Sequence, residues 1–139
     1  MLRDRYPGAS FEVVNTAMTA INSHVLLEIA RDCAQQQPDA YLVYMGNNEV
    51  VGPFGPGTVF QHWSPSLRLI RAGLRFKATR TGQLFDGTIR SFSPEKAAPT
   101  WQGMGMFMDN AVAADDPRLP PTYDNFGQNL RDICSIARR

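Results

Sequence analysis

The sequence is poor in the residues that build metal sites and disulfide frameworks. Its 139 residues include two cysteines and two histidines, with no Cys-x-x-Cys or Cys/His pattern. Cys33 and Cys134 lie far apart, each on a predicted helix, so we expect two free, buried thiols. Asp115 and Asp116 have no third oxygen ligand in register, which favours a solvated turn over a metal. The sequence therefore predicts no metal and no cofactor.

Long apolar runs and an excess of one charge are also missing. No run approaches the length of a membrane span, and the charged, turn-like residues 1–7 do not resemble a signal peptide. Fourteen basic and 13 acidic residues give a net charge of +1, which provides no overall case for nucleic acid as a partner. The compartment stays unknown, with the cytoplasm as the default expectation.

What the chain does contain is an alternation of strand-like and helix-like segments. Residues 11–15 and 41–45 are rich in β-branched and aromatic residues and predict two strands. Between them a helix is expected, capped by Asn22 or Ser23 and ended by Pro38. Its apolar stripe consists of Leu26, Ile29, Ala30 and Cys33. Strand, helix and strand in succession predict a right-handed βαβ unit with parallel strands, and therefore an α/β fold.

Two further helices are predicted downstream. The first opens at Ser64 or Ser66 and runs to about residue 82. One of its faces is apolar (Leu67, Ile70, Leu74, Ala78) and another is basic (Arg68, Arg71, Arg75). The basic face is either solvated or a grip for phosphate, carboxylate or a membrane surface. The second helix opens at Thr122 or Asp124, and its predicted apolar face consists of Phe126, Leu130, Ile133, Cys134 and Ala137.

Residues 83–121, between these helices, are rich in proline and glycine, and we expect them to form a lid-like insertion. Their methionine-rich part, 101–108, predicts either a lid over a site or a segment that packs on its own domain. No strand follows the last helix, and the first strand begins abruptly near residue 11. We therefore expect one incomplete domain over residues 1–139, truncated at both ends unless Met1 is a true start. Its exposed sheet edges predict self-association.

Chemistry is expected where the strand 41–45 ends, because loops beyond the carboxyl ends of parallel strands converge on a crevice. The residues there are Gly46, Asn47, Asn48 and Glu49. The segment 15–23 should lie beside them and offer backbone N–H groups at the start of a helix. Neutral donors aimed at one point stabilise an oxyanion on an ester or amide carbonyl, each by roughly 3–4 kcal/mol. The alternative is that Gly-Asn-Asn is only a turn.

Other polar residues give weaker signals. Glu49 suggests an acid or base but has no evident partner in the sequence. His24 and His62 are more typical of structural or exposed positions than of a catalytic base. Ser23 and His24 are adjacent on a predicted helix, so their side chains point in different directions and a hydrogen bond between them is not expected.

The segments 15–23 and 46–49 resemble blocks two and three of the SGNH (GDSL-type) hydrolases, which are esterases and lipases of three-layer α/β/α, flavodoxin-like fold. In that family the oxyanion hole uses a block-two glycine N–H and a block-three asparagine side chain. The resemblance implies that Ala20 and Asn47 are the corresponding oxyanion donors. It also implies that Gly46, Asn48 and Asn22 are neighbours of the substrate. Asn48 stands where the family usually has aspartate.

The sequence motif Gly-Asn-Asn-Glu-x-x-Gly-Pro, together with the segment 116–119 before a Tyr-x-x-Phe helix, resembles motifs of a bacterial subgroup of these hydrolases. The family's Gly-Asp-Ser block and late Asp-x-x-His block are not in the chain. The resemblance therefore implies a fragment of a hydrolase that acts on small-molecule esters through an acyl-serine in the full-length protein. Alone, the chain should hydrolyse esters negligibly. The alternative is a non-catalytic α/β piece that binds a ligand or partner at the same crevice.

Overall fold

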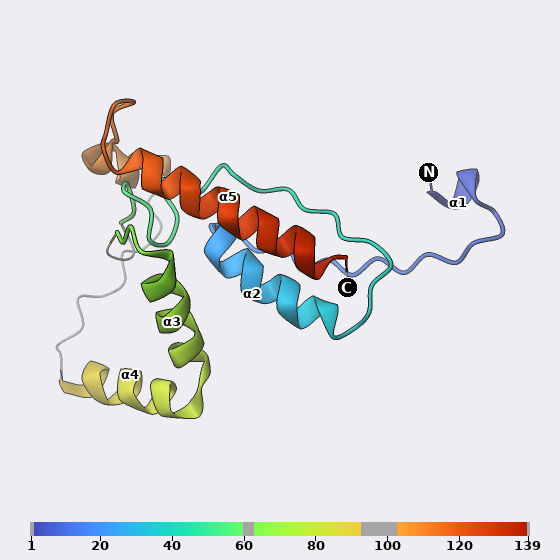
Figure 1. Ribbon diagram of the computed structural model, residues 1–139, viewed down its shortest axis with the longest axis horizontal. Helices are drawn as coiled ribbons and strands as arrows, with labels where there is room; N and C mark the ends of the chain where they lie inside the picture. The colour runs from blue at the N-terminus through green and yellow to red at the C-terminus, as the bar shows by residue number, and fades with distance from the viewer. Residues whose placement is uncertain (1, 60–62, 93–102, 139) are drawn as a thin grey trace.

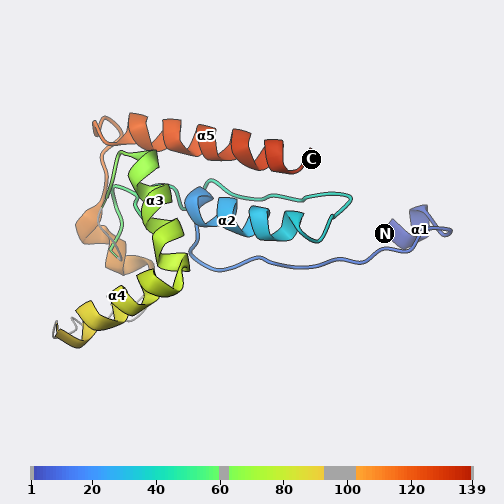
Figure 2. The same cartoon turned by 60° about the horizontal axis from the view of Figure 1, so that its bottom comes forward.

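The computed structural model describes residues 2–59, 63–92 and 103–138. Within these ranges the regular structure is helical (Figure 1). Its elements are α1 (Leu2–Arg5), α2 (Ser23–Ala34), α3 (Leu67–Ala78), α4 (Arg80–Phe92), the 3₁₀ helix η1 (Met104–Asn110) and α5 (Leu119–Ile136). The helices α2 and α5 pack along one another, while α3 and α4 form a second pair that extends away from them (Figures 1 and 2).

The predicted parallel sheet is wrong, because the described residues contain no β-strand. Residues 11–15 and 41–45 are not helical, but neither segment pairs with a strand in the described part of the chain. The side chains of Val13, Leu42 and Tyr44 are 81, 101 and 93% exposed. Strand preference reflects packing against neighbouring strands on a pleated surface. Strand-prone residues without such neighbours therefore form no sheet. The predicted α/β fold class is wrong for the same reason.

The helix α2 confirms the predicted helix and its start after Asn22. Its buried face coincides only in part with the predicted apolar stripe, which shares Ala30 and, at the edge of the core, Leu26 with it. Leu27 and Ala30 are buried against Ile133 of α5, with Met45 packed at the side of this core. Ile29 and Cys33 of the predicted stripe are only half-buried. The surface that α2 packs against is therefore α5 and not a sheet.

The predicted helix from Ser66 to about residue 82 is two helices that meet at Thr79. Ser66 caps α3 as expected, since its side chain accepts a hydrogen bond from the Leu69 N–H at 3.4 Å. Thr79 has extended backbone, and its Oγ1 donates to the Phe76 carbonyl at 2.6 Å and accepts from the Gly82 N–H at 3.0 Å. A Cβ at Gly82 would meet the Phe76 carbonyl oxygen at 1.9 Å. This corner therefore requires glycine, which the helical periodicity does not reveal.

The helix α5 begins at Leu119, three residues before the earliest predicted start, because Pro120 and Pro121 fit in a first turn that needs no N–H partners. The buried residues of α5 are Leu119, Thr122, Asn125, Asn129 and Ile133. Only Ile133 belongs to the predicted apolar face; Leu130 and Cys134 are exposed. Both cysteines are free, but the expected burial is wrong for Cys134 and only partial for Cys33.

The region predicted as a lid-like insertion, 83–121, is largely helical where it is described, because it contains most of α4, η1 and the start of α5. Residues 93–102, including Trp101, lie outside the described residues, and so does His62. In η1, Met106 is half-buried and Met108 is exposed. In the described part of the chain, no helix is long and apolar enough to cross a membrane.

The predicted solvated turn at Asp115 and Asp116 carries an ion pair. Asp116 Oδ2 lies 2.6 Å from Arg118 Nη2, and the hydrogen bonds from Arg118 hold the pKa of Asp116 down to about 2. Arg118 also donates to the Pro56 carbonyl at 3.0 Å. The start of α5 is thereby tied to residues 46–57, which are called the 46–57 turn below. No group of three or more potential metal-ligating side chains occurs among the described residues.

Candidate functional site

Buried polar side chains gather where the N-terminus of α2, the 46–57 turn and the middle of α5 meet. Ser23 and Asn129 are fully buried, and His24 and Glu49 are 6 and 3% exposed. Arg71 of α3 and Asp132 of α5 border them. These six residues are called the polar cluster. Burying polar groups is costly unless each finds a hydrogen-bond partner, so the contacts within the cluster decide whether it is stable.

Glu49 binds the first residue of α2 with both carboxylate oxygens. The Ser23 N–H donates to Oε1 at 2.8 Å, and the Ser23 hydroxyl donates to Oε2 at 2.7 Å. The first N–H groups of a helix have no partners within the helix and carry partial positive charge. Asn22, although suited to capping by type, makes no side-chain cap bond. Glu49 therefore caps α2 from 26 residues further along the chain.

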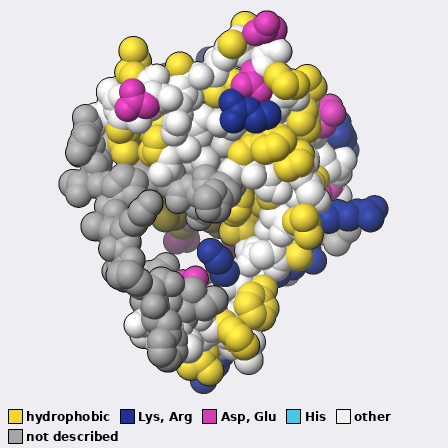
Figure 3. Space-filling view, turned by 90° about the vertical axis from the view of Figure 1, so that its left-hand side faces the viewer, with side chains coloured by type: hydrophobic (Ala, Val, Ile, Leu, Met, Phe, Trp, Pro, Cys, Tyr) yellow, Lys and Arg dark blue, Asp and Glu magenta, His cyan; other side chains and the backbone are white. Residues whose placement is uncertain are grey.

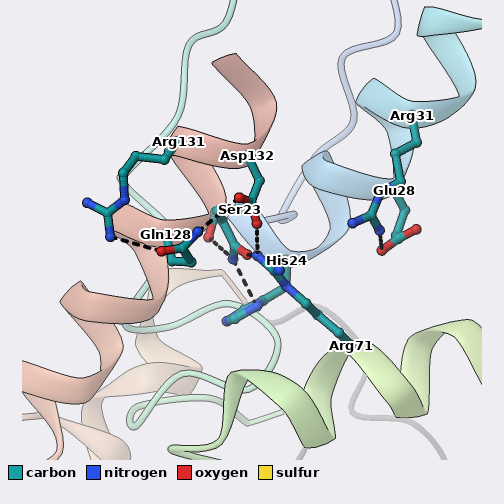
Figure 4. A network of polar contacts seen from close by, with 9 residues as sticks. Ser23, His24, Glu28, Arg31, Arg71, Gln128, Arg131 and Asp132 are labelled. Atoms are coloured by element: carbon teal, nitrogen blue, oxygen red, sulfur yellow. Dashed lines mark hydrogen bonds and ion pairs between the residues drawn. The ribbon is translucent and has the colours of Figure 1, made fainter. Parts of the chain in front are cut away.

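Asn129 of α5 joins the other members of the cluster. Its Nδ2 donates to Ser23 Oγ at 2.9 Å and lies 3.0 Å from His24 Nδ1. Its Oδ1 accepts from Arg71 Nη2 at 2.7 Å, and the same nitrogen of Arg71 donates to Asp132 Oδ2 at 2.6 Å. In Figure 4 the labelled side chains of Ser23, His24, Arg71 and Asp132 converge from three helices. One amide thus connects α2, α3 and α5.

Burial shifts the protonation of both central titratable groups. Desolvation, with a smaller contribution from the positive charge of Arg71, lowers the pKa of His24 to about 4. Desolvation raises the pKa of Glu49, although its hydrogen bonds from Ser23 act in the opposite direction. His24 is therefore neutral at pH 7. Because Asn129 Oδ1 faces Arg71, its Nδ2 must donate to His24 Nδ1, which places the histidine proton on Nε2.

The cluster does not have the geometry of a nucleophile and base. Ser23 and His24 both bind Asn129, and no hydrogen bond joins them to each other in the described structure. The Ser23 hydroxyl is fully buried and its proton is directed to Glu49. An acyl acceptor must reach solvent-borne substrate, so we assign the cluster to holding three segments together and not to bond cleavage.

The predicted site residues lie next to the polar cluster along the chain, since Asn22 precedes Ser23 and Asn48 precedes Glu49. The structure brings their two segments together. Asn48 Nδ2 donates to the Ile21 carbonyl at 3.1 Å. Asn22 Nδ2 donates to the Pro53 carbonyl at 2.6 Å, while its buried Oδ1 has no described partner. Asn47 and Ala20 are exposed and each adjoins a residue of the Asn48–Ile21 pair. Gly46 is exposed with a φ of 119°, which favours glycine.

Two backbone positions beside the cluster are left-handed without being glycine. Ala20 has a φ of 61° and Phe54 a φ of 65°. The Phe54 ring stands edge-on to His24, with ring centroids 5.8 Å apart and an interplanar angle of 84°. Such conformations cost about 1–2 kcal/mol for an L-residue other than glycine. The block-two position that the family resemblance assigns to glycine therefore has a backbone that suits glycine, but here it carries alanine.

Sequence reasoning missed Glu49, Asn129 and Arg71 as members of one site. The expectation that Glu49 has no partner is wrong, since Ser23 binds both of its oxygens. A usable signal lies in α5, where Asn125, Asn129 and Ile133 repeat at four-residue spacing and lie on one buried face. Polar residues at core spacing indicate a buried network, but the pattern does not identify their partners.

Comparison with known proteins finds no matching family model, no matching curated protein and no matching solved structure. The resemblance to SGNH hydrolases therefore depends on the quoted residues alone and stays a prediction.

We predict that His24→Gln flattens the acid side of the stability profile. Because the pKa of His24 is about 6.5 unfolded and about 4 folded, its contribution is fully present above pH 6.5 and is lost as the pH falls toward 4. The loss amounts to at most about 3 kcal/mol. Urea unfolding of both proteins, followed by circular dichroism between pH 7 and pH 4, measures this difference.

The comparison isolates His24 because Glu49, Arg71 and Asp132 are the same in both proteins. The raised pKa of Glu49 has the opposite sign, since protonating Glu49 favours the folded state as the pH falls. It offsets part of the His24 loss in the native chain. Parallel stability curves for the native chain and His24→Gln would contradict the assignment.

We predict that Ala20→Gly stabilises the chain by about 1 kcal/mol, because glycine adopts a positive φ without steric cost. Ala17→Gly is the matched control, since Ala17 is also exposed but does not have a positive φ. It should destabilise slightly through unfolded-state entropy. The midpoints of urea unfolding, compared at an unchanged dependence of the unfolding free energy on urea concentration, measure the stability change in both variants. An equal or larger loss of stability in Ala20→Gly would show that this turn does not hold a left-handed residue.

Proposed function

We propose that the chain is part of an SGNH-type hydrolase that cleaves small-molecule esters through an acyl-serine, and that it contributes oxyanion donors. The observation that carries the proposal is the pairing of the segments 20–23 and 46–53. Four hydrogen bonds join them, between Ser23 and Glu49 (two), Asn48 and Ile21, and Asn22 and Pro53. These segments are the two that resemble consecutive blocks of that family.

The proposed donors are the side-chain amide of Asn47 and the backbone N–H of Ala20. Both residues are exposed, so a substrate carbonyl can reach them, whereas Asn48 and Asn22 use their amides to fix the two segments. Both donors are neutral, so they gain most when negative charge develops on the carbonyl oxygen. The helix dipole of α2 is not a third contributor, because Glu49 already occupies its N-terminus.

The nucleophilic serine and its base would come from residues beyond these 139. Ser23 is fully buried and His24 is nearly so, and neither can take that part. We propose the same substrate class as the sequence indicates, a small-molecule ester. No cofactor enters the proposal, since an oxyanion hole with an acyl-serine needs none.

The proposal predicts that a tetrahedral anion binds between the two donors. In the ¹⁵N-labelled chain, titration with dimethyl phosphate should shift the Ala20 N–H and the Asn47 side-chain resonances together, with a single dissociation constant. Asn47→Ala should weaken the response at Ala20 by about tenfold, the loss of one hydrogen bond to a charged group. Asn110→Ala, which removes another exposed asparagine, should leave it unchanged.

Two outcomes would contradict this assignment. One is the absence of any shift at Ala20 and Asn47 at tens of millimolar anion. The other is a shift that Asn47→Ala leaves unaltered. Hydrolysis of p-nitrophenyl acetate by the chain alone should stay at background, and turnover that Asn47→Ala abolishes would mean that the chain holds its own nucleophile.

We also propose that the chain self-associates through the segments 11–15 and 41–45. Val13, Val14, Leu42 and Tyr44 are 74 to 101% exposed, and large apolar side chains that a chain leaves exposed can be covered by association. The segment that leads from α2 to the 46–57 turn runs back along the pair α2 and α5 (Figures 1 and 2). Met45 packs against the core, whereas Leu42 is fully exposed.

Self-association predicts that light scattering on the eluted native chain gives a mass above 15.5 kDa at tens of micromolar protein. Leu42→Lys should return it toward the monomer, because a charge on a strand-like edge opposes pairing. Leu69→Lys, at a 70% exposed position of α3, is the control and should not change the mass. A monomeric native chain, or equal effects of the two variants, would overturn the proposal.

A further inference from the structure

The helices α3 and α4 expose apolar and basic side chains on one surface. Leu69, Phe76 and Phe85 are 70, 50 and 62% exposed. Arg68, Arg75 and Arg80 are also exposed. These six residues are called the α3–α4 surface. In Figure 3, hydrophobic side chains reach the surface in the lower part of the molecule, where α3 and α4 lie, with Lys or Arg side chains beside them.

Helical spacing places these residues in adjoining rows. Leu69 and Phe76 are seven residues apart on α3, and so are Arg68 and Arg75, so each pair lies along one line of the helix. The buried face of α3 is a different one and contains Ile70. The rings of Phe76 and Phe85 lie 6.3 Å apart at 51°, which carries the apolar row from α3 to α4. The result is an apolar strip bordered by guanidinium groups.

The charge of the chain is concentrated at this surface. Residues 67–85 contain five basic and no acidic residues, leaving nine basic and 13 acidic residues elsewhere. The net charge of the whole chain is small because the positive charge of residues 67–85 is balanced by the excess of acidic residues in the rest of the chain. Of the five basic residues, Arg71 points inward to Asp132 and belongs to the polar cluster. The other four, Arg68, Arg75, Lys77 and Arg80, are exposed.

We propose that the α3–α4 surface binds an anionic lipid surface. Leucine and phenylalanine side chains enter the boundary between headgroups and acyl chains, while arginine side chains reach the lipid phosphates and carboxylates. Charge complementarity selects this occupant, because Arg68, Arg75 and Arg80 are exposed beside the apolar strip, whereas Asp86, the acidic residue of α4, is half-buried. The aliphatic Leu69 at the start of the strip favours lipid over nucleic acid, which would stack on aromatic rings. This proposal does not depend on the hydrolase function.

Co-sedimentation of the 139-residue chain with vesicles tests the proposal. The chain should bind phosphatidylcholine vesicles that contain phosphatidylserine, bind pure phosphatidylcholine vesicles far more weakly, and lose affinity as salt increases. Arg68→Gln with Arg75→Gln should weaken partition about 25-fold, or about fivefold for each charge. Leu69→Ser with Phe76→Ser should weaken it roughly tenfold.

Matched controls come from α5 and the residue that follows its C-cap. Arg131→Gln with Arg138→Gln removes the same number of exposed charges, and Tyr123→Ser removes a side chain that is 54% exposed. Both should leave partition within about twofold, because neither alters the α3–α4 surface. Far-ultraviolet circular dichroism checks that the helices persist in every variant, and Arg71 is left intact in all of them so that the polar cluster is retained.

Three outcomes would overturn the proposal. They are no binding to anionic vesicles, equal binding to both vesicle types, and equal losses for the α5 controls and the α3 variants. Binding of a single-stranded oligonucleotide that responds to the α3 variants, without vesicle binding, would assign the surface to nucleic acid instead.

Discussion

The rest of the structure depends on the two hydrogen bonds between Ser23 and Glu49. A helix N-terminus needs acceptors for its free N–H groups, and α2 obtains one from a carboxylate 26 residues away. Asn22 could serve this purpose locally, but its amide donates to Pro53 instead. The connection between α2 and the 46–57 turn is therefore closed by a buried, charge-assisted contact. Closing it fixes where the segment 41–45 must run.

Asn129 converts that contact into a three-helix arrangement. Its amide can satisfy Ser23, His24 and Arg71 only if α2, α3 and α5 approach in one orientation. A buried polar network is stabilising when its members are paired and costly where one is not. In the polar cluster the carboxylate of Glu49 and the amide of Asn129 are paired, whereas Arg71 Nε is buried without a described partner. The apolar core of α2 and α5 consists of few residues, mainly Leu27, Ala30 and Ile133. The polar cluster therefore contributes a preference for one arrangement of the three helices over others, which so small an apolar core does not provide.

The sequence predicted what local signals determine and failed where partners are distant. The start of α2 after Asn22 and the Ser66 cap of α3 follow from residues within one helical turn. The strands 11–15 and 41–45 did not form because a strand needs a neighbour, and strand preference does not tell whether one is present. The face of α5 was wrong because buried Thr122 and Asn129 look like solvated residues. The two predicted site segments did meet, through side chains of Asn22 and Asn48 that the resemblance places beside the substrate.

The exposed site residues inherit their geometry from the buried cluster. Ala20 is left-handed one residue before Ile21, whose carbonyl binds Asn48, and three residues before Ser23, which binds Glu49. A strained conformation persists only where the surrounding contacts impose it. The direction of the Ala20 N–H is therefore set by one half-buried and one buried hydrogen bond of the residues that follow it. The same holds for Asn47, which lies between Gly46, itself at positive φ, and the anchored Asn48. We therefore expect a change at Glu49 to alter the proposed donors Ala20 and Asn47 without contacting them, because Glu49 helps to hold together the two segments that carry them.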